Sequence, residues 1–411
     1  MREDWEECCF EDLLDYEQPT NYIVKSTAYN DAYETPVLTA GKSFIKGYTN
    51  ETEGIFDNLP TIIFDDFTTA SQFVNFKFKV KSSAMKILVP TSELVNMDFA
   101  YYAMQVNQIR SDTHKRYWIS VYAKKKFLLP TLVEQRAIVS KIEELFSDLD
   151  KGIADLKKAQ NQLKVYRQAV LKKAFEGLEK ETTLEEIKEN SLIGLVRASG
   201  LQNSNGEGTA YLKMDKIDMI GNVDLEDLVY VETNEDEIEK YALKTGDILL
   251  NTRNSYELVG KTGIVRNINK TVVFNNNIMR IRVNESYDPY FICYQLISPF
   301  VRKQMDKFKK ATTSVCALYQ RNLFPLKLKV TDIKEQHQII QEIESRLSVC
   351  DKVEESITES LEKAKALRQS ILKKAFEGTL LSEEEIAACK AAPDYEPASV
   401  LLKKIKAEKK K

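Results

Sequence analysis

The sequence contains few of the residues that hold metals and disulfides. Six cysteines occur among 411 residues, none in C-x-x-C spacing, and only two histidines, His114 and His337, are present. Neither histidine has a nucleophile or a second ligand at a spacing that catalytic or metal sites use. The sequence therefore predicts no zinc site, no disulfide framework and no cofactor.

Long hydrophobic runs and a strong net charge are also missing. No stretch approaches the roughly 18 apolar residues of a membrane-spanning helix, so we expect a soluble, cytoplasmic protein with no membrane partner. The net charge is −3, which does not indicate nucleic-acid binding by itself. Phosphate contacts depend instead on local clusters of lysine and arginine. A length of 411 residues predicts roughly two to three domains, and 43% hydrophobic residues are enough to form their cores.

Three short motifs resemble catalytic motifs but fail at a required position. Gly260-Lys261-Thr262 lacks the earlier glycine of a phosphate-binding loop, because Ser255 stands there. Asp288-Pro289-Tyr290-Phe291 lacks the second proline of the amino-methyltransferase motif, and no glycine-rich methyl-donor loop precedes it. Asp65-Asp66 lacks the downstream E-x-K of a magnesium-dependent nuclease. We interpret the first motif as a turn and the last as a polar loop, and we predict that the chain is not an enzyme.

One segment is present twice. Residues 167–177 return as residues 368–378 with nine of eleven positions identical, a shift of 201 residues. The same shift superposes Glu134-Gln135 on Glu335-Gln336 without a gap. Self-similarity at a fixed offset indicates a repeated structural unit. The sequence therefore predicts a duplicated long helix.

The first copy of this helix carries a heptad seam. Its apolar residues recur in alternating steps of four and three, and a weaker seam of the same period follows 201 residues later. Gly177 and Gly378 stand where helix stops are expected. At about 1.5 Å per residue, a helix of about forty residues reaches roughly 60 Å. The two seams can be buried against each other or against a partner. The first seam comprises Ile138, Ile142, Leu145, Leu149, Leu156, Leu163 and Val170.

A segment with the short apolar runs and alternation of strands precedes each helix. Apart from Phe10–Leu13, which resembles Leu184–Ile187, the two segments share little sequence. We expect an α+β protein in which two different α/β domains, head 1 and head 2, are mounted on repeated helices. The expected division is head 1 at 1–130, the first helix at 131–178, head 2 at 179–330, the second helix at 331–381 and a tail at 382–411. We expect a helix start at Ser382 and a frayed amphipathic end to the tail.

The helix motifs resemble those of a known family. Leu128–Gln135 and the helix end at Leu171–Gly177 resemble the conserved-region helices of specificity subunits of type I restriction-modification systems. Tyr211–Met214, Tyr241–Arg253 and Gly260–Gly263 resemble the core of the target-recognition domains of that family. The resemblance covers nearly the whole chain.

This resemblance implies a DNA-recognition subunit that performs no chemistry itself. Two target-recognition domains are held apart by an antiparallel coiled coil with a pseudo-twofold internal repeat, and each reads one half of a bipartite, asymmetric DNA site. Two methyltransferase subunits dock on the helices and methylate an adenine in each half-site, and restriction subunits with motor and nuclease activity cleave unmodified DNA. Half-site separation follows from protein geometry in other two-headed DNA readers. Val330–Lys334 departs from the family pattern, because the first copy has Leu129-Pro130 there.

Base reading requires paired donors or acceptors on loops that can enter a groove, whereas lysine, serine and threonine mostly contact phosphates. In head 1 the expected DNA-binding residues are Lys42, Ser43, Lys46, Tyr48, Thr68, Thr69, Ser71 and Gln72, with Arg116 as a phosphate contact. In head 2 they are Arg253, Asn254, Ser255, Tyr256 and Lys261, then Asn275, Asn276 and Asn277, with Arg321 as a phosphate contact. The asparagine run is equally typical of a turn. Further phosphate candidates are Arg302, Lys303, Lys309 and Lys310.

Two other functions stay open on the sequence. A stand-alone nuclease or methyltransferase requires a catalytic motif, which we do not find. A coiled-coil adaptor that binds proteins and not DNA requires heads without groove-reaching polar loops. If methyltransferases do dock, we expect them on the outer helix surfaces and around the repeated residues Gln168, Lys172, Phe175, Gln369, Lys373 and Phe376.

Overall fold

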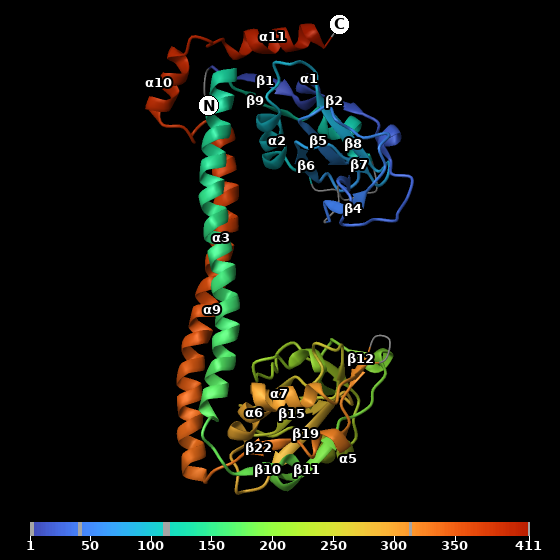
Figure 1. Ribbon diagram of the computed structural model, residues 1–411, viewed down its shortest axis with the longest axis vertical. Helices are drawn as coiled ribbons and strands as arrows, with labels where there is room; N and C mark the ends of the chain where they lie inside the picture. The colour runs from blue at the N-terminus through green and yellow to red at the C-terminus, as the bar shows by residue number, and fades with distance from the viewer. Residues whose placement is uncertain (1–3, 40–42, 110–115, 312–314, 410–411) are drawn as a thin grey trace. The chain divides into compact units, whose positions relative to one another are not determined.

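The computed structural model describes residues 4–39, 43–109, 116–311 and 315–409. It contains two compact units (Figure 1). Unit 1 comprises Met1–Leu156 and Glu359–Lys411, and unit 2 comprises Lys157–Thr358. Each unit therefore combines one head with part of both long helices. Within the described ranges, no helix is long and apolar enough to cross a membrane.

Head 1 is built on small, mostly antiparallel sheets. Strand β1 (Glu6–Cys9) pairs with β9 (Lys126–Leu129) just before the first long helix. The main sheet has the order β2-β8-β5-β6 and only antiparallel neighbours, with β2 Leu14–Glu17, β8 Met85–Pro90, β5 Thr61–Asp65 and β6 Ser71–Val74. A further sheet has the order β4-β3-β7, with β4 Ile45–Thr49, β3 Thr35–Leu38 and, parallel to β3, β7 Lys79–Val80. The helical elements are α1 (Phe10–Leu13), η1 (Pro19–Tyr22), α2 (Met97–Val106) and η2 (Trp118–Tyr122).

Head 2 repeats this topology. Strands β10 (Glu181–Thr183) and β22 (Lys327–Lys329) pair before the second long helix, as β1 and β9 do before the first. The main sheet has the order β11-β19-β15-β17, with β11 Lys188–Ile193, β19 Ile278–Val283, β15 Ile248–Asn251 and β17 Thr262–Ile264. Another sheet has the order β12-β14-β13-β18, with β12 Gln202–Asn203, β14 Val229–Val231, β13 Thr209–Leu212 and, parallel to β13, β18 Val272–Phe274. The internal repeat thus extends into heads that share little sequence.

Head 2 also has elements of its own. A small sheet of order β16-β21-β20 joins Arg253–Asn254, Cys316–Ala317 and Lys310–Ala311. The helical elements are α4 (Leu184–Ile187), η3 (Ser199–Leu201), η4 (Met214–Lys216), α5 (Glu235–Tyr241), α6 (Pro289–Ile297), α7 (Pro299–Asp306) and α8 (Gln320–Leu323).

The two resembling openings form equivalent one-turn helices. Helix α1 buries Phe10 and Leu13, and α4 buries Leu184 and Ile187. Both begin with a capping box, in which the third helical residue returns a carboxylate to the backbone of the capping residue. The short resemblance therefore reflects a shared way of starting each head.

The predicted long helices are present and stop where the glycines indicate. Helix α3 spans Leu132–Ala174 and α9 spans Ile333–Phe376. Gly177 and Gly378 follow them with φ of 95° and 73°, the left-handed conformation that ends helices. At both starts a buried glutamine amide donates to a nearby carbonyl, Gln135 to Pro130 over 2.9 Å and Gln336 to Thr331 over 2.8 Å.

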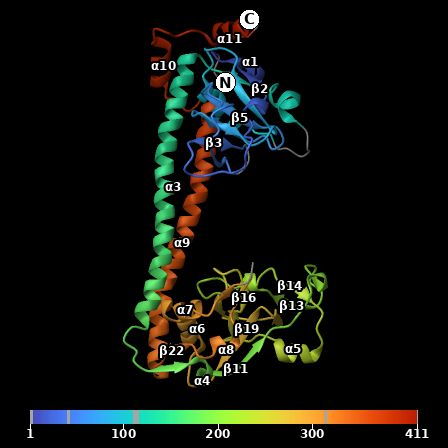
Figure 2. The ribbon, with the colours of Figure 1, turned by 45° about the vertical axis from the view of Figure 1, so that its right-hand side comes forward.

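The helices meet through ion pairs that follow the repeat. In unit 2, Arg167 Nη2 lies 2.8 Å from Asp351 Oδ1. In unit 1, Arg368 pairs with Asp150. Adding 201 to 150 and 167 gives 351 and 368, so each unit contains the same pair with the two helices exchanged. Such reciprocal contacts characterise a twofold-related interface. The helices, seen side by side in both views (Figure 2), are therefore antiparallel.

Repeated phenylalanines join each helix end to a head. In unit 1, the ring of Phe376 packs on Phe99 of α2 with 5.0 Å between centroids. In unit 2, the ring of Phe175 packs on Phe291 of α6 at 5.4 Å. In each unit, the end of one long helix thus packs on the head that precedes the other long helix in the sequence. The seam residues Ile138 and Ile142 are buried in the core of head 1.

The tail is docked on head 1, so our expectation of a frayed end was wrong. After the expected start at Ser382, which caps its helix, α10 (Glu383–Ala391) and α11 (Ala398–Glu408) follow. Leu401, Leu402 and Ile405 are buried in the same core as Phe10. Their spacing places them on one helix face. Lys406 also pairs with Asp12 of α1 over 3.3 Å.

We expect substitution of Leu401 by alanine to destabilise unit 1 by about 2–4 kcal/mol, because it empties a buried site. Leu401 is 2% exposed, whereas its neighbour Val400 is 38% exposed. Val400→Ala is the matched control and should cost less than about 1 kcal/mol. Urea unfolding of both variants tests this, and equal costs would contradict docking of the tail.

We expect Arg167→Met to cost more unfolding free energy than Arg368→Met. The Arg167 side chain is 5% exposed and pairs with Asp351 and Glu354, whereas that of Arg368 is 35% exposed and pairs with Asp150. Because the acidic partners remain largely solvated, we expect about 1–2 kcal/mol for Arg167 and less than about 1 kcal/mol for Arg368. Denaturant unfolding measures both, and the reverse order would refute this account of the coil.

Candidate nucleic-acid interface

Each head brings together two loops that are distant in sequence. In head 1 the turn between β5 and β6 meets the segment before η2, where Tyr117 N donates to Asp66 O over 2.9 Å. In head 2 the longer loop between β15 and β17 meets the segment before α8, where Leu318 N donates to Thr252 O over 2.9 Å. The strands involved occupy equivalent places in the two main sheets. Both heads therefore present a matching pair of loops.

The head 1 turn is shaped by two aspartates. Asp65 Oδ1 accepts from Phe67 N at 2.8 Å and from Thr68 N at 3.0 Å, so these two residues lie exposed at the tip. Buried Asp66 accepts from Trp118 N at 2.9 Å and holds the second loop. Both carboxylates thus organise backbone, in agreement with the polar-loop interpretation. The described residues contain no group of three or more His, Cys, Asp or Glu that could hold a metal ion.

Thr69 has a structural role in this turn. It has a positive φ of 60° and is 6% exposed. Its hydroxyl donates to the carbonyl of Ile109 over 2.7 Å, which satisfies a buried polar group. Thr69 was predicted as a DNA contact, but its hydroxyl faces inward and supports the turn.

The other predicted residues of head 1 lie in three places. Arg116 is exposed directly before the segment that Asp66 holds. Ser71 and Gln72 are half-buried on β6, and Ser71 Oγ accepts from Gln105 Nε2 at 2.9 Å. Ser43 and Lys46 are exposed and Tyr48 is half-buried at the β3–β4 hairpin, which belongs to a different sheet. Lys42 lies outside the described residues.

The head 2 loop begins with the short strand β16. Arg253 and Asn254 pair with Ala317 and Cys316 of β21, which ties the two loops together. Arg253 is exposed. Asn254 Nδ2 donates to Asn251 Oδ1 over 3.0 Å, and its Oδ1 accepts from the N–H of half-buried Ser255 at 2.9 Å. Asn254 therefore shapes the loop, and Arg253 presents its guanidinium to solvent.

Two cation–aromatic stacks lie in the same region. Lys309 Nζ is 5.0 Å from the ring centroid of Tyr256, and the guanidinium of Arg321 is 5.5 Å from that of Tyr319. Tyr256 and Tyr319 are 49% and 45% exposed. Such stacks orient both partners. Tyr319 was missed because nothing in the sequence links it to a loop more than sixty residues earlier.

Lys261 was predicted at the surface but lies beneath the loop. It is 6% exposed, and its ammonium donates to Met214 O over 2.9 Å. Burial lowers its pKa, although Asp215 and Asp218 oppose this effect. With Gly260 at a φ of 82° before it, the segment forms a turn, as expected, and is not a phosphate-binding loop.

The asparagine run also supports the loops from within. Asn275 is 8% exposed, and its Oδ1 accepts from Asn277 N at 3.2 Å. The carbonyl of Asn277 accepts from Thr252 N at 2.8 Å and from Asn251 Nδ2 at 3.0 Å. Asn276 is half-buried between them. The turn interpretation of this run is therefore confirmed, and Asn275 and Asn277 serve the fold.

The phosphate candidates around α7 differ in exposure. Arg302 hydrogen-bonds the carbonyl of Gly260, and burial lowers its pKa despite nearby Asp306. The side chain of Lys309 is 6% exposed and pairs with Asp306 over 2.7 Å. Lys303 is exposed, whereas the side chain of Lys310 lies outside the described residues.

The remaining catalytic-looking motif is a helix cap. Asp288 Oδ1 accepts from Tyr290 N at 2.8 Å and starts α6, with Pro289 at the first helical position. His337 Nε2 lies 3.2 Å from Asp288 Oδ2. In this geometry Asp288 and Pro289 begin a helix.

Known proteins resemble this chain over most of its length. Residues 196–363 match the family described as "Type I restriction modification DNA specificity domain". The EcoR124I/EcoR124II specificity subunit of Escherichia coli is 32% identical over 377 residues, which cover 87% of this chain and 89% of that protein. The EcoKI specificity subunit of Escherichia coli K12 is 27% identical over 294 residues, which cover 68% and 63%.

A solved structure shares the fold. A chain of a type I R-M system superposes with a TM-score of 0.68 at 16% identity and covers 92% of this chain and 99% of its own length. The α+β organisation with heads on long antiparallel helices is thus found in an experimentally determined protein. Together with the identity to the EcoR124I/EcoR124II subunit, this shows that the chain belongs to the family of type I restriction-modification specificity subunits.

Proposed function

We propose that this chain recognises a bipartite, asymmetric DNA target and directs partner enzymes to it. Each head would read one half-site. The observation that carries the proposal is the repeated loop pair, in which equivalent backbone contacts at Asp66–Tyr117 and Thr252–Leu318 carry different exposed side chains. Equivalent mounts with different side chains suit a protein that reads two different short sequences.

The exposed side chains of the two heads are the proposed contacts to bases and phosphates. Arg253 is our base-reading candidate in head 2, because a guanidinium can donate two bonds to guanine in the major groove. Arg116 and Arg321 are phosphate candidates beside the loop pairs. At the head 1 hairpin, Ser43 and Lys46 would also contact phosphates.

The chemistry would come from partners. We propose that two methyltransferase subunits dock on the outer surfaces of α3 and α9 and methylate an adenine in each half-site. Restriction subunits would add motor and nuclease activity, and the chain itself would be non-catalytic. This complex would act in the cytoplasm, where foreign DNA is met.

A genome-wide methylation map tests the function. We expect cells that express this chain with its methyltransferase to gain one bipartite adenine motif, two specified blocks around a fixed gap, that is missing when the chain is omitted. We expect the new motif because, in the proposed complex, this chain alone recognises the DNA sequence. Co-purification of the proteins without any new motif would instead favour a protein-binding adaptor.

Arg253→Ala should relax one position in one block of that motif. The loss of a bidentate base contact costs about 1–3 kcal/mol of discrimination, so wrong bases should become methylated at that position. Lys244→Ala is the control, since Lys244 is an exposed cation of head 2 that precedes β15, whereas Arg253 follows it. Methylation maps of both variants measure the base preference at each position of the motif. An unchanged motif for Arg253→Ala would show that Arg253 does not contact a base.

A further inference from the structure

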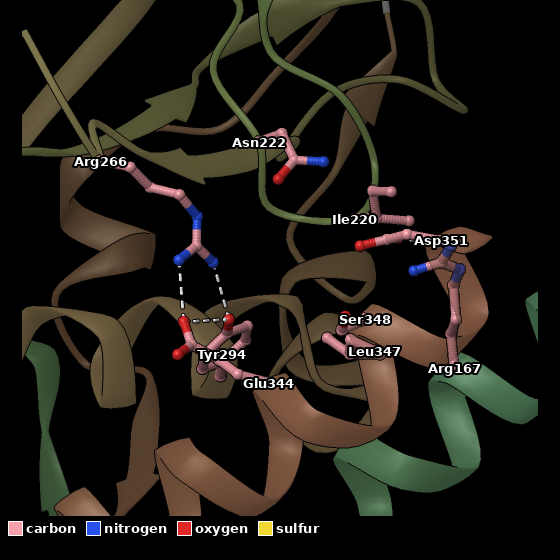
Figure 3. A pocket seen from close by; sticks show the side chains of 9 residues that line it. All are labelled: Arg167, Ile220, Asn222, Arg266, Tyr294, Glu344, Leu347, Ser348 and Asp351. Atoms are coloured by element: carbon pink, nitrogen blue, oxygen red, sulfur yellow. Dashed lines mark hydrogen bonds and ion pairs between the residues drawn. The ribbon is translucent and has the colours of Figure 1, made fainter. Parts of the chain in front are cut away.

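A cavity of about 240 Å³ separates part of head 2 from the long helices within unit 2 (Figure 3). Ile220 and Asn222 line it from a loop of head 2, and Leu347, Ser348 and Asp351 line it from α9. The head and the helices are therefore not closely packed along this stretch. Before this stretch, however, Ile340 and Ile343 of α9 are buried in the core of head 2.

One polar cluster bridges the head and the helix at the edge of this cavity. Arg266, two residues after β17, donates from Nη1 to Glu344 Oε1 of α9 over 2.8 Å and from Nη2 to the Tyr294 hydroxyl of α6 over 2.8 Å. Tyr294 in turn donates to Glu344 Oε1 over 3.1 Å. We call Arg266, Tyr294 and Glu344 the latch. Figure 3 shows the three side chains converging.

Arg266 stays charged and Tyr294 stays protonated at neutral pH. Burial lowers the pKa of Arg266, but its bonds to Glu344 and Tyr294 outweigh burial, so the pKa is raised overall. Burial is the main cause of the raised pKa of Tyr294, which therefore stays a donor. A charge-assisted bond to a carboxylate is stronger than a neutral one and depends on direction. The latch can therefore resist rotation of the head as well as separation.

The latch lies far along α9 from the point where head 2 joins that helix. Head 2 rejoins α9 at Ile333, eleven residues before Glu344. At about 1.5 Å per residue, the latch stands about 16 Å along the helix from that connection. Together with the buried side chains of Ile340 and Ile343, a contact at this distance opposes tilting of the head more effectively than a contact at the connection itself.

We propose that the latch fixes the tilt of head 2 on the long helices and so helps to set the number of unspecified base pairs between the two half-sites. The proposal rests on the proposed function. Adding one base pair moves a half-site by about 3.4 Å along the duplex and turns it by about 35° around the duplex axis, so the head must change its orientation to follow. Arg266, Tyr294 and Glu344 are positioning residues, because they would act through the orientation of the DNA-reading loops.

The repeat supplies a matched control. Glu143 is the counterpart of Glu344, since 143 plus 201 is 344, and it contributes to the raised pKa of Tyr102 on α2, which burial mainly causes. Within the described residues, however, Glu143 forms no ion pair. Glu143→Gln thus makes the same chemical change in unit 1 without breaking a latch.

The test is a methylation map of cells that express the methyltransferase with wild-type chain, Arg266→Met, Glu344→Gln or Glu143→Gln. For the two latch variants we expect unchanged specified blocks and an about tenfold rise in modified sites whose gap is one base pair longer or shorter, which corresponds to about 1.4 kcal/mol. Glu143→Gln should keep the wild-type gap. Thermal unfolding of each purified complex identifies a variant that fails to fold, and Glu344→Gln, which nearly preserves shape, then decides.

The outcomes separate the two proposals. A wild-type bipartite motif with an unchanged gap in both folded latch variants overturns the latch. A change in the specified bases with an unchanged gap also overturns it, because the cluster would then affect reading and not spacing. If the wild-type chain produces no bipartite motif at all, the proposed function fails.

Discussion

The packing of each long helix's last turn against a head is the contact on which the rest of the structure depends. Phe376 packs on Phe99 in unit 1, and Phe175 packs on Phe291 in unit 2. The two helix ends have nearly the same sequence. The same motif therefore joins each helix end to a head, once in unit 1 and once in unit 2. The ion pairs of Arg167 and Arg368 are likewise equivalent in the two units, with the roles of the two helices exchanged. A duplicated helix can therefore pair with its own copy within one chain.

The same constraint explains why the heads could diverge. Sheet order and the backbone contacts between the two loops are preserved in both heads, as the bonds to Asp66 and Thr252 illustrate. Those contacts use backbone atoms, which do not depend on side-chain identity. Exposed positions such as Arg116 and Arg253 are then free to differ. Equivalent mounting and different surfaces are the physical basis of the proposed two-part reading.

Residue type alone could select the candidate loops but not the atoms that face solvent. Lys46, Arg116 and Arg253 are exposed, as base or phosphate contacts require. Thr69, Lys261 and Asn275, chosen for the same polar chemistry, are buried because carbonyls and N–H groups inside the loops need partners. A polar side chain that satisfies buried backbone looks the same in a sequence as one that awaits a ligand.

The long helices, their duplication and their stops at Gly177 and Gly378 follow from local sequence, because heptad spacing and helix termination act over a few residues. Only the tertiary structure decided how distant segments meet. It joined β16 to β21, buried Leu401 in head 1 and brought Arg266 to Glu344. These contacts depend on which surfaces the folded chain places together, and the residues along the chain carry no local signal for them.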